Sequence, residues 1–331
     1  MFASFAVCTG LCGCITPPVV AEAHVDGWTL GESTYPRDGT VVEVRGAGED
    51  APVLRGLFVP SDRGAPIVVH FAESGGSITS SLHRRDQYAA LSELGFASLA
   101  IDYRGVGLSD GKRSPQRLDE DALAIWEHAL QLVDGDASRL VIRGTSLGTV
   151  AASSLLARGV TPGAVIAFAP VRPETVARRY GYAVFWDPLV WLVAPLLARF
   201  SEGDPLEWLT RPGVPRLVVA SPRDELLGER DFGRLSEGVE ASGGTCHVPK
   251  SLSIIVFNND PVMEALGNHI ALTRPSFDVG DVESAFLRGA FPGVPDVDQR
   301  LDRLQRIGPE SAVENVWSSR DALARLKGLL G

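Results

Sequence analysis

Residues 139–148 read RLVIRGTSLG, in which a short β-branched run leads directly into the pattern GTSLG at 144–148. The run has the composition of a buried strand, and the small residues at 150–158 predict a helix. A strand, a sharp turn and a helix in this order place a serine hydroxyl above the carboxyl edge of a sheet. The glycines relieve steric conflict where the backbone is strained and a neighbouring strand comes close. The stretch therefore predicts an α/β sheet with a nucleophile, Ser146, at its edge; the alternative is an ordinary tight turn.

The helix expected after Ser146 also predicts where a developing negative charge would be held. Its first backbone N–H groups have no acceptor within the helix, and the positive end of its dipole faces the serine. The N–H of Leu147 is therefore a candidate donor to an oxyanion.

A serine nucleophile needs a histidine base and a carboxylate that keeps the imidazole in the right tautomer. Of the six histidines, His269 is the one expected in a loop after the last predicted strand, where a base can reach the sheet edge. The alternative for it is an ordinary surface histidine. Asp224 is the predicted acid because it follows a strand in a turn at the same edge. Asp260 is the alternative, although it shares the loop of His269 and is less able to lie across from it.

The rest of the body alternates short β-branched runs with helix-period stretches, which is typical of a mainly parallel sheet joined by helical crossovers. An antiparallel pair is expected at the start of the sheet. The predicted strands are 40–45, 56–60, 66–71, 96–102, 139–143, 164–169, 214–221 and 252–257, and the predicted helices are 82–94, 118–133, 150–158 and 229–241.

Residues 171–211 differ in character, because they are rich in tryptophan and leucine and are broken by prolines. They predict a helical cap inserted into the core. Its apolar part is interpreted either as helices that pack on the core or as a lid over an acyl-binding cleft. The expected organisation is a leader at 1–25, a core with this cap at 26–279 and a helical C-terminal extension at 280–331.

Composition excludes several classes of function. The 331 residues are 45% hydrophobic and 22% charged, with a net charge of −10 and no basic patch that could follow a phosphate backbone. Nucleic acid is therefore not an expected partner. The residues His, Glu and Asp do not cluster with metal-ligand spacing, so neither a metal nor another cofactor is implied.

The N-terminus carries three of the four cysteines. The segment Leu11-Cys12-Gly13-Cys14 resembles a bacterial lipobox, which implies lipidation of Cys14 and a lipid-anchored protein of the bacterial cell envelope. There is no Lys or Arg near Met1 and the apolar run is short. The alternatives are a disordered end and a cytoplasmic protein.

A second motif, DYRGVGLSDG at 102–111, follows the predicted strand 96–102. Together with the chain order Ser146, Asp224, His269, it resembles the α/β-hydrolases, particularly the branch of serine aminopeptidases and membrane-associated acyl hydrolases. The resemblance covers roughly 42–272. It implies a mostly parallel eight-stranded sheet flanked by helices, with a helical cap insertion. A nucleotide-binding loop is the competing interpretation, but the glycine spacing fits neither the dinucleotide fingerprint nor a P-loop.

One segment departs from that family. Where its members carry His-Gly, this chain has FAESGG at 71–76. Aligning 74–76 with the family's Asn-Ala-Gly form implies that the N–H of Ser74 is the second oxyanion donor. Glu73 then lies close to a site meant for negative charge.

The resulting prediction is a serine hydrolase that cleaves carboxylic ester or thioester bonds of a small acyl substrate through an acyl-enzyme. A serine peptidase acting on small peptides is the first alternative. A catalytically silent binding protein on the same fold is the alternative of a different class.

Overall fold

The computed structural model describes residues 39–46, 51–74, 77, 82–114, 117–175, 202–250, 267–273 and 277–295. Several predicted features lie outside these residues. They are the leader with Cys14, the middle of the cap at 176–201, the predicted strand 252–257, Asp260, and the C-terminal extension beyond 295.

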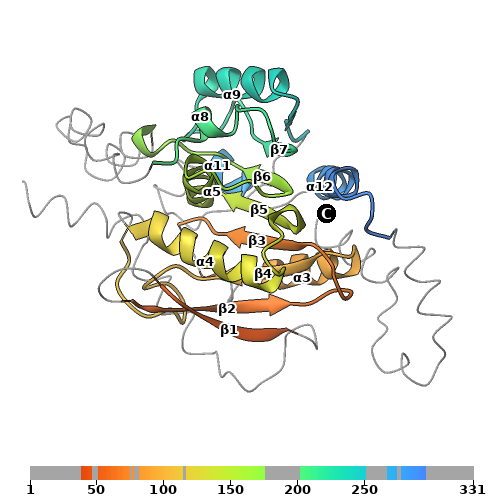
Figure 1. Ribbon diagram of the computed structural model, residues 1–331. Coiled ribbons are helices and arrows are strands. Elements are labelled where there is room, and N and C mark those ends of the chain that lie inside the picture. The colour runs from red at the N-terminus through yellow and green to blue at the C-terminus, as the bar shows by residue number, and fades with distance from the viewer. Residues whose placement is uncertain are drawn as a thin grey trace, which may run out of the picture.

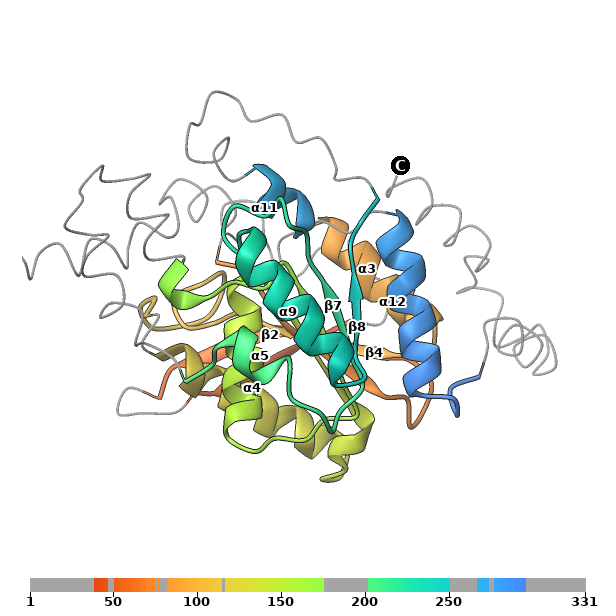
Figure 2. The same ribbon diagram turned by 90° about the horizontal axis from the view of Figure 1, so that it is seen from above.

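The eight strands form one sheet in the order β1-β2-β4-β3-β5-β6-β7-β8 (Figure 1; β8 is labelled in Figure 2). β1 pairs antiparallel with β2, and β2 pairs antiparallel with β4, while every other pair is parallel. This confirms the mostly parallel eight-stranded sheet with an antiparallel start. The strands are β1 (Thr40–Arg45), β2 (Val53–Val59), β3 (Ile67–Phe71), β4 (Ala97–Ile101), β5 (Leu140–Thr145), β6 (Ala164–Phe168), β7 (Arg216–Val219) and β8 (Thr245–His247).

Helices cover both faces of the sheet, with α4, α5 and α9 on one face and α3 and α12 on the other (Figure 2). Because both faces are covered, every residue of β3, β4, β5, β6 and β7 is buried. The helices are α3 (Leu82–Glu93), α4 (Leu118–Leu132), α5 (Leu147–Ala157), α8 (Pro205–Trp208), α9 (Glu229–Ala241), α11 (Gly267–Leu272) and α12 (Phe277–Ala290).

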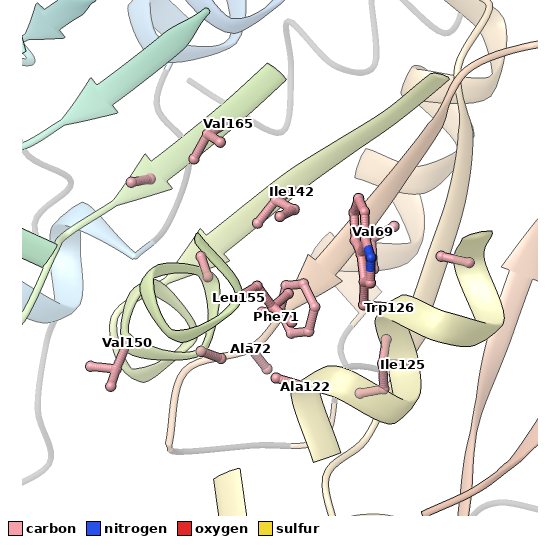
Figure 3. Packing of buried hydrophobic residues seen from close by; sticks show 14 of the residues in the cluster. Val69, Phe71, Ala72, Ala122, Ile125, Trp126, Ile142, Val150, Leu155 and Val165 are labelled. Carbon is pink, nitrogen blue, oxygen red and sulfur yellow. The ribbon is translucent and has the colours of Figure 1, made fainter. Parts of the chain in front are cut away.

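The larger hydrophobic cluster lies between the central strands and the helices α4 and α5, and Figure 3 shows part of it. Ile142 of β5, one of its members, lies in the strand that leads to Ser146 and is fully buried. Ser146 therefore stands at the end of a strand that is packed along its whole length. Other labelled members are Val69, Phe71, Ala72, Ala122, Ile125, Trp126, Val150, Leu155 and Val165.

Besides shifts of a few residues in the bounds of other elements, the structure differs from the sequence-based expectation in β8, α12 and the position of His269. Strand β8 was not predicted, because it has only three residues at the edge of the sheet and none of them is fully buried. Helix α12 crosses the boundary expected at residue 280 and contacts β6 and β7. His269 was predicted in a loop, which is wrong, since it lies in the short helix α11.

The two ends of the predicted cap are joined at the core. Arg172, near its start, donates from Nη2 to Asp204 at 2.9 Å and also forms an ion pair with Asp231 of α9. Gly203 packs directly on α5, because a Cβ there would lie 2.2 Å from the carbonyl oxygen of Val150. The described residues on either side of 176–201 therefore lie close together on the core.

Candidate active site

Ser146 occupies a strained turn between β5 and α5. Its backbone φ of 50° and ψ of −114° lie where residues with a side chain are rare. The backbone N–H of Ser146 donates to the carbonyl oxygen of Phe168 at 2.9 Å, which ties the turn to β6. Gly148 has no room for a side chain, since a Cβ would lie 1.9 Å from the carbonyl oxygen of Phe71. The sequence had indicated this sharp turn, and the close approach of α5 to β3 explains the second glycine.

Three side chains that are far apart in the sequence form one hydrogen-bonded line. The Oγ of Ser146 lies 2.9 Å from Nε2 of His269, and Nδ1 of His269 lies 3.0 Å from both carboxylate oxygens of Asp224. All three are buried, with exposed fractions of 6%, 4% and 1% for Ser146, His269 and Asp224. Because an ionised carboxylate only accepts, Nδ1 donates to Asp224, and Nε2 is then free to accept from the serine hydroxyl.

The carboxylate of Asp224 is held by the loop in which it lies. Its Oδ1 accepts from the backbone N–H groups of Leu226 at 2.8 Å and Leu227 at 3.2 Å. Its own N–H donates to the carbonyl oxygen of Ser221. These bonds stabilise a buried negative charge and fix the direction in which it faces the imidazole.

His269 is also held through its main chain, by a residue that the sequence analysis did not identify. Glu225 accepts from the backbone N–H groups of Asn268 at 3.1 Å and His269 at 2.8 Å, and from the side-chain amide of Asn268 at 2.7 Å. The only sequence signal is that a second carboxylate directly follows Asp224.

The two predicted oxyanion donors lie on separate elements. Leu147 is the first residue of α5, so its N–H has no acceptor within the helix. Ser74 lies in a turn that follows β3, next to the half-buried Glu73. Further along this segment, Ser77 donates to the buried carboxylate of Asp102, which anchors the chain after β3 to the end of β4.

The other candidate groups lie elsewhere. His70 is inside β3, with Nε2 3.2 Å from the hydroxyl of Ser98. His128 is on α4, where burial lowers its pKa, and burial raises the pKa of the Cys246 thiol, which disfavours the thiolate. Among the described residues, three or more His, Cys, Asp and Glu side chains nowhere group together as a metal site would require.

Known proteins share this arrangement of elements. A family model described as serine aminopeptidase, S33, matches residues 69–230. An esterase structure from Pyrococcus furiosus aligns with a TM-score of 0.56 and 18% identity over 81% of this chain and 95% of that one, a likeness that shows the fold. The chain has the α/β-hydrolase fold. This confirms the resemblance found in the sequence.

Two relatives of this α/β-hydrolase align with it over different shares of their own length. Lysophosphatidylserine lipase ABHD12 of Danio rerio is 33% identical over 109 residues, which are 32% of this chain and 28% of the lipase. An uncharacterised protein of Mycobacterium tuberculosis is 28% identical over 218 residues, covering 64% of this chain and 70% of that protein. The family match and the esterase and lipase neighbours support a hydrolase.

The loop at 102–111 of this α/β-hydrolase is a structural support. Arg104 donates to the carboxylate of Asp121 from Nε at 2.8 Å and from Nη2 at 2.6 Å, and the Arg104 backbone N–H also donates to it at 2.9 Å. This buried pair ties the loop to α4. No helix in the described part of the chain is both long and apolar enough to cross a membrane.

Proposed function

We propose that the protein is a serine hydrolase of carboxylic esters or thioesters, with Ser146 as nucleophile, His269 as base and Asp224 as the acid that orients it. One observation carries the proposal. Ser146 Oγ at a strained strand-to-helix turn lies 2.9 Å from His269 Nε2, while Nδ1 of the same ring lies 3.0 Å from both oxygens of Asp224. This is the geometry that proton removal from a serine hydroxyl requires.

The chemistry follows from these positions. His269 takes the proton of Ser146 as Oγ attacks the acyl carbonyl carbon, and Asp224 stabilises the imidazolium that forms. The N–H groups of Leu147 and Ser74 hold the oxyanion of the tetrahedral intermediate. The imidazolium then gives its proton to the leaving alcohol or thiol, and the acyl group stays on Ser146. Water, activated by the same imidazole, releases the acid and restores the serine.

An ester or thioester is favoured over a peptide bond as the substrate. The apolar part of the predicted cap, residues 180–200, holds only Asp187 and Arg199 as charged residues, which suits an acyl group better than the charged terminus of a peptide. Two of the proteins to which the chain is similar are named a lipase and an esterase, which points the same way. The description of the matching family, serine aminopeptidase, supports the peptidase as second candidate.

Labelling with a fluorophosphonate probe tests the nucleophile. We expect the wild-type protein to be labelled and Ser146→Ala to remain unlabelled while keeping its fold. A folded wild-type protein that is not labelled would favour the catalytically silent binding protein. Comparing kcat/KM for p-nitrophenyl esters of short and medium acyl chains with that for aminoacyl anilides tests the substrate. A clear preference for the anilides would move the assignment to a peptidase.

A further inference from the structure

The carboxylate of Glu225 accepts two hydrogen bonds from the main chain of α11. Its Oε1 accepts from the backbone N–H of Asn268, and its Oε2 accepts from the backbone N–H of His269. The side-chain amide of Asn268 adds a third bond to Oε1. The two oxygens of one carboxylate therefore bind two consecutive main-chain donors, of which the second belongs to the proposed base.

These contacts perform the role of a helix cap from a distance. The first N–H groups of a helix lack acceptors, and a side chain at the residue just before the helix usually supplies one. In α11 the acceptor for Asn268 and His269 stands 43 and 44 residues earlier in the chain. A helix of six residues is not stable by itself, so its start depends on such contacts. The negative charge is also favourable at this end of the helix dipole.

Adjacent residues thus hold His269 at different atoms. Asp224 holds the imidazole at Nδ1, and Glu225 holds the main-chain nitrogen. The other ring nitrogen, Nε2, lies 2.9 Å from Ser146 Oγ. With two points fixed by one loop, the distance from Nε2 to the serine is set by the position of that loop.

We infer that Glu225 is a positioning residue, which sets the distance between His269 and Ser146 by fixing the start of α11. The inference rests on the proposed function, because the base must stand within hydrogen-bond reach of the nucleophile before attack. A misplacement of about 1 Å in such a pair can lower the rate roughly 100-fold. Loss of Glu225 should therefore affect the chemical step rather than substrate binding.

The test compares Glu225→Ala and Glu225→Gln with Glu237→Ala, a control with an exposed carboxylate on α9. We expect kcat for a p-nitrophenyl ester to fall roughly 10- to 100-fold in Glu225→Ala, with KM little changed. The unfolding temperature should fall as well, because the N–H groups of Asn268 and His269 lose their acceptor. Glu225→Gln should lie between this variant and the wild type, because its amide keeps the shape and one acceptor oxygen. The rate of fluorophosphonate labelling should fall in the same order, and Glu237→Ala should match the wild type.

A second readout does not depend on turnover. The ring Nδ1–H proton of His269 should give a downfield NMR signal, since it is hydrogen-bonded to a carboxylate. We expect this proton to exchange faster with solvent in Glu225→Gln and Glu225→Ala. If Glu225→Ala does not fold, Glu225→Gln decides the question with both readouts.

Two results would overturn the inference. One is a folded Glu225→Gln or Glu225→Ala protein with the kcat and labelling rate of the wild type. The other is a rise in KM with kcat unchanged, which would assign Glu225 to substrate binding. Failure of the proposed function looks different, because the wild-type protein would then not be labelled. In that case the exchange rate of the His269 ring proton alone decides whether Glu225 positions the residue.

Discussion

The two halves of the proposed site are held by different means. Ser146 is fixed by local backbone geometry, between a buried strand and a helix that begins at the next residue. His269 is fixed by carboxylates that lie 44 and 45 residues away in the sequence. The nucleophile therefore depends on how closely the main chain packs, whereas the base depends on a few side-chain hydrogen bonds. A single substitution should therefore displace the base without unfolding the protein more easily than it can displace the nucleophile.

The largest effect is expected where the two halves meet. Ser146→Ala and His269→Ala should each lower kcat for an acyl ester by a factor on the order of 10⁶, because the serine and its base act as a unit. Circular dichroism should show an unchanged fold. His247→Ala, on strand β8, is the control and should keep its activity. Full activity in His269→Ala together with its loss in His247→Ala would show that the base is misassigned.

The next largest effect is expected for the carboxylate of Asp224, which orients the imidazole. Asp224→Asn should lower kcat by roughly 10³–10⁴ with little change in stability. The asparagine oxygen can still accept from the N–H groups of Leu226 and Leu227, but its NH₂ would face Nδ1 and favour the wrong tautomer. Steady-state kinetics of the purified variant measure the loss. A comparable loss in Asp260→Asn, with Asp224→Asn active, would transfer the role to Asp260.

Substitutions near the nucleophile should act by disturbing the packing of the main chain. Gly148→Ala should lower the free energy of unfolding by about 3 kcal/mol or more, because α5 would have to move away from β3. A Cβ at this position would lie 1.9 Å from the carbonyl oxygen of Phe71, and backbone cannot yield as a side chain does. Urea denaturation measures the change. Gly233→Ala, in α9 with open space around its Cα, should be neutral or stabilising. Equal stability of the two variants would contradict the packing argument.

The smallest effect is expected for the hydroxyl of Thr149, which lies close to the nucleophile turn. The hydroxyl of Thr149 donates to the carbonyl oxygen of Ser146 at 2.6 Å and accepts from the N–H of Val171. Thr149→Val should destabilise the fold by about 1–3 kcal/mol, because the buried N–H of Val171 loses its acceptor. The kcat should change less than in Asp224→Asn, since the backbone N–H of Thr149 still bonds Ser146. Thr149→Ser keeps the hydroxyl and should behave as the wild type in thermal unfolding and turnover.

The same contrast explains what the sequence could predict. The turn at Ser146 was recognisable because all its determinants lie within ten residues, and the predicted helix 229–241 has the bounds of α9. Helix α11 was missed because its cap is Glu225, which no pattern around His269 reveals. Strand β8 was missed because a three-residue edge strand has too few buried positions to show a period. Local sequence patterns predict helices, strands and turns, whereas contacts between residues far apart in the sequence become visible only in the folded structure.

The junction of Arg172 with Asp204 and Asp231 has a consequence for how the protein can diversify. Arg172 and Asp204, which flank residues 176–201, are anchored at neighbouring points of the core, and Gly203 packs on α5. The cost of closing a loop rises only slowly with its length. Evolution or an engineer can therefore lengthen, shorten or exchange the sequence between these anchors while the sheet and the serine stay as they are.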